Sequence, residues 1–228
     1  MGTFKFAALV IVITLTGCSN TDTPVTSSAP SGATSSNPSV STIVLSATPA
    51  TGQWNGLESC VNKGTATPAA APTPATEGLE GVLDFGKLSQ DHVQECSPFS
   101  MVPAVGGAHY PVWANCGFYM SGVPDMFGVH SMEHGAVWIA YDPGIGESEL
   151  NAIRTATVQS THVLASPYAG LKSKISLNAW SRTLSIDSTA DPRFKKFMEI
   201  YVQGPQTPEL GAACDHGIGT PVASYDKR

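Results

Sequence analysis

The stretch that decides the fold is Gly135-Ala136-Val137-Trp138-Ile139-Ala140-Tyr141. Its short apolar run, rich in β-branched and aromatic residues, predicts a buried strand. Asp142-Pro143-Gly144 then predicts a turn, and the segment Glu147–Gln159 follows with acidic residues in its first turn. That segment repeats small or apolar residues at helical spacing, so we expect an amphipathic helix there. The repeating positions are Leu150, Ile153, Ala156 and Thr157.

Farther toward the C-terminus, the pattern returns to strands and ends in a second helix. Thr161–Ser166 and Lys174–Trp180 are predicted as strands, and we expect Arg182–Ile186 to extend the second of them. Asp191-Pro192 is typical of a helix start, and this helix should run to Val202. Its expected apolar stripe comprises Phe194, Phe197, Met198 and Tyr201.

The residues before the decisive stretch are less regular. Gly78–Leu88 is predicted as a strand with a turn, whereas Met101–Asp125, rich in Gly, Pro and aromatic residues, is predicted as a long ordered loop. The expected order is therefore β-α-β-β-α, in an α+β fold with a small antiparallel sheet and two packed helices. A ferredoxin-like arrangement fits this order, although only half of that pattern is visible.

The N-terminus has the features of an export signal. One positive charge, Lys5, precedes the apolar run Phe6–Ile13, which is too short to span a bilayer. The run leads to Leu15-Thr16-Gly17-Cys18, which resembles the bacterial lipobox, where cleavage precedes a lipidated cysteine. We expect residues 1–17 to be removed and Cys18 to anchor an extracytoplasmic protein to the cell membrane. An ordinary secretory signal with an accidental cysteine is the alternative.

A low-complexity region separates this signal from the folded part. Ser19–Ala50 and Gly64–Thr76 consist mostly of small and polar residues, which cannot bury enough apolar area to offset the entropy of ordering them. We therefore expect a disordered tether over residues 18–76, with a small island at 52–63 that contains Trp54. The folded domain is expected over 77–215, followed by a tail over 216–228.

Charge and cysteine content narrow the class of protein. The formal net charge is −6 and no cluster of basic residues occurs, so we expect no nucleic-acid partner. Four cysteines remain besides Cys18, and in an oxidising compartment four thiols favour two disulfides with three possible connectivities. Our preferred pairs are Cys60–Cys96, which would hold the island, and Cys116–Cys214, which would hold the C-terminal segment. The alternative makes Cys116 a soft metal ligand.

Histidines supply the candidate chemistry. His92 and His109 precede the densest segment, His130-Ser131-Met132-Glu133-His134. Residues four apart lie about 13 Å from each other on a strand but about 6 Å apart on a helix. His130 and His134 can therefore share an ion only from a helical turn, in which Met132 points away and Glu133 can hold the second ring nitrogen of His130.

The same segment matches His-x-x-Glu-His, the motif of the zinc peptidases called inverzincins. Those enzymes place the motif in a long helix within a far larger domain. Here a strand follows at once, and the segment that holds Glu209, the acid nearest to the expected downstream position, is predicted to be irregular. The pattern therefore argues against a peptidase.

Several stretches resemble one family, the domain of unknown function DUF3105. They are Gly106–Tyr119 (GGAHYPVWANCGFY), Val129–Trp138 (VHSMEHGAVW), Ser166–Tyr168, Ala179-Trp180 and Gly204–Glu209. The resemblance extends from about Glu80 to Cys214. It implies that the family has histidine at positions matching His92, His109, His130 and His134, and cysteine at those matching Cys116 and Cys214. Cys60 and Cys96 look like additions of this sequence, which supports pairing them with each other.

These observations favour a metal site formed by His109, His130 and His134, with Met132, Glu133 and His92 as further candidate ligands. Copper is our first expectation because imidazole binds either oxidation state and thioether binds Cu(I); zinc is the alternative. The methionines near the histidines are Met101, Met120, Met126 and Met132. His162 and His216 are interpreted as structural or surface residues.

Three functions are compatible with such a sequence. The first is a copper-binding lipoprotein for storage, delivery or tolerance, and the second is a metal-dependent enzyme, a zinc hydrolase or a copper oxidase. The third is a scaffolding or interaction module with hydrogen-bonded histidines. Glu133 is the only obvious general base beside the histidines, so binding without turnover is favoured. The sequence indicates no particular protein partner.

Overall fold

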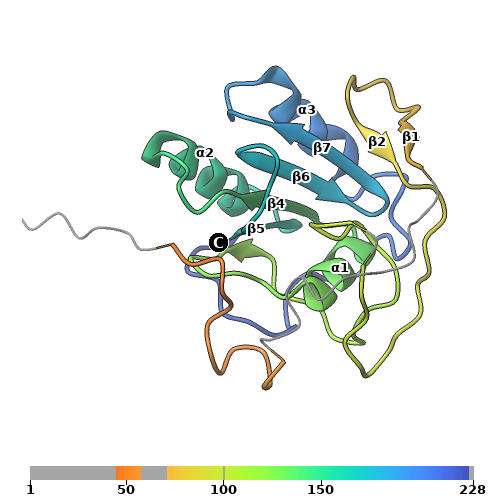
Figure 1. The fold of residues 1–228 in the computed structure, drawn as a ribbon, viewed down its shortest axis with the longest axis vertical. Helices are drawn as coiled ribbons and strands as arrows, with labels where there is room; N and C mark the ends of the chain where they lie inside the picture. The colour runs from red at the N-terminus through yellow and green to blue at the C-terminus, as the bar shows by residue number, and fades with distance from the viewer. Residues whose placement is uncertain (1–44, 58–70, 100, 226–228) are drawn as a thin grey trace, which may run out of the picture. The chain divides into compact units, whose positions relative to one another are not determined.

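The predicted GAVWIAY strand is present as β4, at the heart of a seven-stranded sheet (Figure 1). The structure is a computed structural model that describes residues 45–57, 71–99 and 101–225. The strands are β1 Thr73–Pro74, β2 Leu83–Asp84, β3 Gly117–Phe118, β4 Val137–Tyr141, β5 Val163–Pro167, β6 Ile175–Ala179 and β7 Arg182–Ile186. The helices are α1 Asp125–Glu133, α2 Glu147–Val158 and α3 Pro192–Tyr201.

The strands lie in the order β1-β2-β7-β6-β4-β5-β3. Helix α2 crosses from β4 to its parallel neighbour β5, and β3 continues this side of the sheet in parallel with β5. On the other side of β4 the pairs are antiparallel, from β6 through β7 to β2 and β1. The sheet is therefore mixed, with its only parallel pairs, among the described strands, on the β5 side.

The predicted α+β class is confirmed, but the predicted small antiparallel sheet with two helices is wrong. The sheet has seven strands, and α1 is an additional helix that directly precedes β4 in the chain. The ferredoxin-like expectation also fails, because β4 and β5 pair directly and leave no gap for the strand that a split βαβ unit requires. Arg182–Ile186 does not extend β6: Ser181, with φ 54°, reverses the chain and starts the separate strand β7.

Alternation along β4 divides the interior into two cores. Trp138 and Ala140 face a core that includes residues of α1, whereas Val137, Ile139 and Tyr141 face the core beneath α2 and α3. Figure 1 shows this arrangement, with α2 and α3 on one side of the sheet and α1 on the other. The sheet is covered on both faces, which explains why β4 reads as a continuous apolar run.

Residues 45–57 contact both cores: Leu45 packs against the core beneath α2 and α3, whereas Trp54 and Leu57 belong to the α1 side. Trp54 is fully buried, stacks on Phe127 at a ring-centroid distance of 5.5 Å and lies 5.7 Å from Tyr119. Trp54, in the predicted island at 52–63, and β1, in the segment 64–76 predicted as tether, therefore both belong to the folded body. The predicted signal at 1–17, Cys18 and Cys60 lie outside the described residues. Among the helices that the structure describes, none is long and apolar enough to cross a membrane.

Candidate metal centre

Helix α1 carries three of the candidate ligands at its C-terminal end, which confirms that His130–His134 is helical rather than extended. The helix ends in a Schellman motif, because Gly135 N–H donates to Met132 O and Ala136 N–H donates to Ser131 O, both at 3.0 Å. Gly135 takes φ 93°, a conformation that side chains disfavour. The chain therefore leaves α1 sharply and enters β4 at once.

A second glycine sets how closely α1 lies on the sheet. A Cβ atom on Gly128 would lie 2.7 Å from the Trp138 ring, so only glycine lets the helix approach β4 this far. At the start of α1, the buried Asp125 accepts hydrogen bonds from Tyr168 Oη at 2.8 Å and from Ala104 N at 3.3 Å. Both contacts fix the position of the helix, and with it the histidines.

The loop before α1 supplies His92 and His109. His109 N–H donates to Asp91 O at 3.0 Å, and Val93 N–H donates to His109 O at 2.7 Å, so the two segments lie side by side as a parallel bridge. The His92 ring stacks on the His130 ring with centroids 4.7 Å apart, and the His109 ring meets it edge-on at 4.9 Å. The ordered loop thus brings both side chains to the end of α1.

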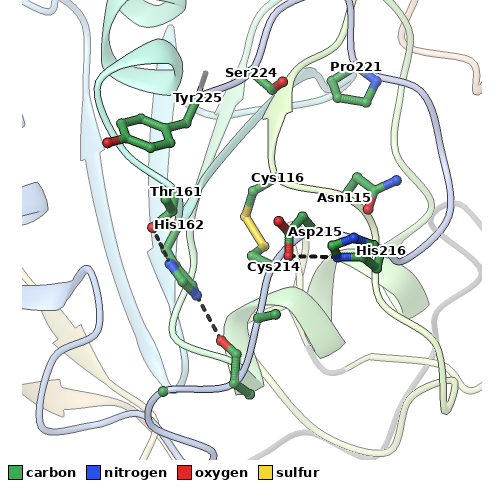
Figure 2. A pocket seen from close by; sticks show the side chains of 13 residues that line it. Asn115, Cys116, Thr161, His162, Cys214, Asp215, His216, Pro221, Ser224 and Tyr225 are labelled. Atoms are coloured by element: carbon green, nitrogen blue, oxygen red, sulfur yellow. Dashed lines mark hydrogen bonds and ion pairs between the residues drawn. A yellow bond between two sulfur atoms is a disulfide. The ribbon is translucent and has the colours of Figure 1, made fainter. Parts of the chain in front are cut away.

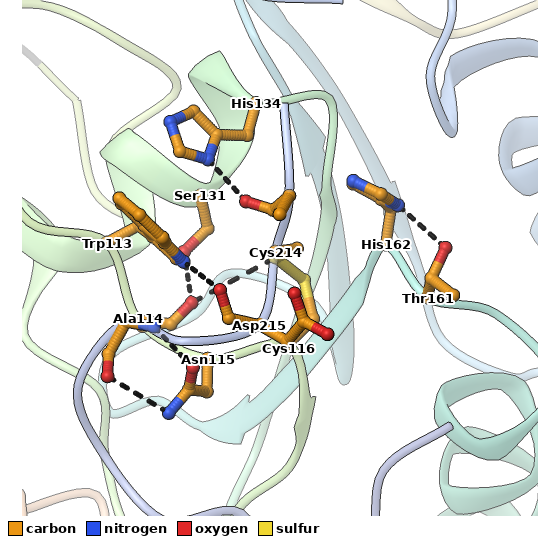
Figure 3. The surroundings of a disulfide bond; sticks show 12 residues. Trp113, Ala114, Asn115, Cys116, Ser131, His134, Thr161, His162, Cys214 and Asp215 are labelled. Atoms are coloured by element: carbon orange, nitrogen blue, oxygen red, sulfur yellow. Dashed lines mark hydrogen bonds between the residues drawn. A yellow bond between two sulfur atoms is a disulfide. The ribbon is translucent and has the colours of Figure 1, made fainter. Parts of the chain in front are cut away.

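Backbone carbonyls orient three of these rings. His109 Nδ1 lies 2.7 Å from Gly107 O, and His130 Nδ1 lies 2.6 Å from Tyr110 O. His134 Nδ1 lies 2.6 Å from Ala213 O (Figure 3). Because a carbonyl oxygen only accepts hydrogen bonds, each Nδ1 must carry the proton, and each neutral ring then has its lone pair on Nε2. Histidines that bind metals are oriented in this way.

The Nε2 atoms meet acceptors instead of donors. His130 Nε2 and His134 Nε2 are 3.0 Å apart, so two lone pairs would face each other if both rings are neutral. His109 Nε2 lies 2.9 Å from Glu133 Oε2, although His109 already donates through Nδ1. These contacts are satisfied only when an extra proton or a metal ion sits between the facing atoms.

Burial favours the metal-binding protonation states. Four of the candidate residues are at most 4% exposed: His109, His130, Glu133 and His134. Burial, reinforced by the neighbouring histidines, lowers the pKa of His130 to about 4 despite its bond to the Tyr110 carbonyl. Burial alone would raise the pKa of Glu133, but the combined hydrogen-bonding and charge interactions with His109, His92 and His130 outweigh it, and the net pKa is lowered. At neutral pH, His130 is therefore unprotonated and Glu133 is ionised.

The ligand atoms fall into two groups that share His130. In the first, one ligand atom each from His92, His109, His130 and Glu133 lies within 4.8 Å of all the others. In the second, the same holds for His130, His134 and Glu209. The expected trio of His109, His130 and His134 is thus divided: His109 and His134 lie in different groups, each together with His130.

The predicted role of Glu133 as the partner of the second His130 nitrogen is wrong. The Tyr110 carbonyl holds that nitrogen, whereas Glu133 faces His109 and, at 3.3 Å, His92. Met132 is fully buried in the core that also contains Trp138. Glu209 is a candidate ligand that the metal prediction omitted: its N–H donates to Glu133 O at 3.0 Å, and its carboxylate lies 3.3 Å from His134 Nε2. The downstream position expected from the His-x-x-Glu-His motif was the signal for it.

The predicted disulfide Cys116–Cys214 is confirmed, which overturns the alternative of Cys116 as a ligand (Figure 3). It fastens the segment that contains Ala213, whose carbonyl orients His134. Cys96 is also disulfide-bonded. Because Cys60 lies outside the described residues, the pair Cys60–Cys96 stays a prediction.

The two remaining histidines lie apart from these groups. Both ring nitrogens of His162 have partners, Thr161 Oγ1 at 2.8 Å and Ala212 O at 2.9 Å. His216 is exposed beside Asp215. Figure 2 shows both at a pocket of about 530 Å³ that also borders the disulfide. Neither histidine is in a candidate metal group among the described residues.

Comparison with known proteins adds a family. No curated protein and no solved structure matches the chain. The family profile described as "Protein of unknown function (DUF3105)" matches residues 92–216, a span that contains every candidate ligand of both groups and the Cys116–Cys214 bridge. The chain therefore belongs to the DUF3105 family.

Proposed function

We propose that this protein is an extracytoplasmic, lipid-anchored metal-binding protein that holds copper at the end of α1 for storage, delivery or tolerance. One observation carries the proposal. Three buried histidines donate hydrogen bonds from Nδ1–H to backbone carbonyls, while their Nε2 atoms face each other or a carboxylate. A divalent cation would relieve these facing acceptors and would offset the charge of the ionised Glu133. The lipobox at Cys18 supports the anchored location.

We favour Cu(II) on the basis of donor chemistry, with Zn(II) as the alternative. Metal–nitrogen bonds of about 2.0–2.1 Å place neighbouring ligand atoms about 2.9 Å apart at right angles, but about 3.3 Å apart in a tetrahedron. The 3.0 Å between His130 Nε2 and His134 Nε2 and the 2.9 Å between His109 Nε2 and Glu133 Oε2 are near the right-angle value. The 3.3 Å from His92 Nε2 to Glu133 Oε2 and from His134 Nε2 to Glu209 Oε2 match the tetrahedral value. The spacing therefore fits either ion, and the preference for copper rests on the nitrogen-rich donor set. Tetragonal sites with nitrogen and oxygen ligands are typical of Cu(II).

A zinc hydrolase is the second candidate, because His130, His134 and Glu209 reproduce the residue types of the inverzincin ligand set. In such an enzyme the motif glutamate, here Glu133, activates the metal-bound water. Glu133 instead contacts His109 and His92, in the other group, and α1 is only 9 residues long. These contacts favour binding over turnover.

Metal titration of untagged protein, stripped with a chelator, tests the proposal. We expect one Cu(II) ion per chain, and His130→Ala should weaken its affinity by at least about a hundredfold, since both groups lose a ligand. His162→Ala is the matched control, because both nitrogens of that ring are already hydrogen-bonded. A His130→Ala/His134→Ala variant that binds copper and zinc as tightly as the parent would refute the site. Hydrolysis supported by zinc would favour the second candidate.

A further inference from the structure

The two ligand groups cannot both be filled at the same time. His130 belongs to both, and its Nδ1 is committed to the Tyr110 carbonyl, so only Nε2 can bind a metal. One nitrogen lone pair serves one ion. We call the set His92, His109, His130 and Glu133 the four-ligand position, and the set His130, His134 and Glu209 the three-ligand position.

The two positions differ in the number of protein donors and in the solvent exposure of their side chains. The four-ligand position includes His109 and Glu133, which are almost completely buried, and an ion there has four protein donors. The three-ligand position has one donor fewer, and the side chain of Glu209 is 50% exposed. Each position contains one carboxylate, so an ion moves between them without a change in the charge of its ligand set. A metal carrier can therefore displace Glu209 first and leave two protein bonds to break.

His92 is the other exposed ligand, with its side chain 42% exposed. Its ring stacks on His130 and contacts Glu133, so it covers the four-ligand position. An ion that left past His92 would have to break its bonds to all four donors. Release through the three-ligand position would be stepwise, because His134 and Glu209 could replace donors of the four-ligand position while His130 stayed bound.

We propose, on the basis of the function proposed above, that the three-ligand position is an exchange site through which the ion enters and leaves the four-ligand position, with His130 as the shared ligand. The fitting partner is a carrier of Cu(II), either a small chelate or a protein, that offers nitrogen or oxygen donors at Glu209. Because the same path serves entry and exit, loss of the exchange site should slow both rates equally and leave the affinity nearly unchanged.

Stopped-flow transfer of Cu(II) from the loaded, full-length protein to excess EDTA tests this inference. Glu209→Gln keeps the side-chain size at an exposed position and removes the charge, so folding is not at risk. We expect transfer at least about tenfold slower than in the parent, with affinity changed less than about threefold. Glu199→Gln, a half-exposed glutamate on α3, is the matched control and should transfer at the parental rate.

His92→Ala should act in the opposite direction, with weaker affinity and faster release, since it removes a ligand of the four-ligand position. Transfer from Glu209→Gln at the parental rate, or two tightly bound ions per chain, would overturn the exchange site and leave the proposed function intact. A parent protein that binds no copper or zinc would overturn both. Slow transfer with unchanged affinity in Glu209→Gln alone would support the inference.

Discussion

Removal of the Cys116–Cys214 bridge should destabilise the domain by an amount that follows from its topology. The two cysteines are 98 residues apart in sequence, and their Cα atoms are 5.4 Å apart, within the usual range. Closing a loop of this length in the unfolded chain corresponds to about 4.7 kcal/mol, and measured losses are typically about 2–5 kcal/mol. For a domain of this size, 1 kcal/mol shifts Tm by about 2–4 °C. We therefore expect a decrease of about 10 °C.

The assay is thermal unfolding of the metal-free protein, with Cys116→Ala/Cys214→Ala compared with the oxidised parent. Alanine avoids burying a new hydroxyl, because both positions are nearly inaccessible. Cys116→Ala alone should lower Tm nearly as much as the double variant, since either change breaks the same bridge. A double variant whose Tm stays within about 2 °C of the parent would show that loop closure contributes little, and the reasoning would be wrong.

Three further predictions address the packing, the buried charge and the anchor. Gly128→Ala should destabilise the protein by about 1–2 kcal/mol in urea titrations, because the clash with the fully buried Trp138 exceeds the helix propensity gained; a more stable variant would contradict this packing. Since folding lowers the pKa of His130 from 6.5 to about 4, only the unfolded state takes up a proton between these values. The metal-free protein should therefore lose up to about 3 kcal/mol as pH falls from 6.5 to 4, and an equal loss in His130→Gln would exclude His130 as the cause. Cys18→Ser should release the exported protein from membranes, whereas continued sedimentation with them would disprove the lipid anchor.

Sequence patterns predicted the helices and strands whose apolar residues recur at regular spacing along the chain. The predicted helices at 147–159 and 191–202 correspond to α2 and α3 within one residue at each end. Helix α1 was anticipated only at His130–His134, because all of its residues are buried and no amphipathic pattern marks it. The strand β2 lies within the predicted strand-and-turn segment Gly78–Leu88. The strands β1 and β3 have two residues each and depend on their neighbours in the sheet, so they leave no periodic pattern.

The candidate site shows the same division between local and distant information. Helical geometry alone brought His130 and His134 together, since four residues make about one turn. Glu209 reaches them only through tertiary structure, with its N–H bonded to Glu133 O and its segment fastened near Cys214. The assignment of His109 and His134 to different groups depends on the path of the loop past Gly107, which no spacing in the sequence reveals.

The energetics of α1 provide a further argument for an ion. A helix whose end buries His130, Glu133 and His134 is costly to fold, because polar groups without satisfied hydrogen bonds lose their hydration. Apolar residues at these positions would pack with less penalty, and Nε2 of His130 can face Nε2 of His134 only when a proton or an ion lies between them. An ion that binds only the folded state offsets this penalty, by about 4 kcal/mol when its free concentration is a thousand times Kd. The proposed ion would thus offset the cost of burying these facing nitrogens.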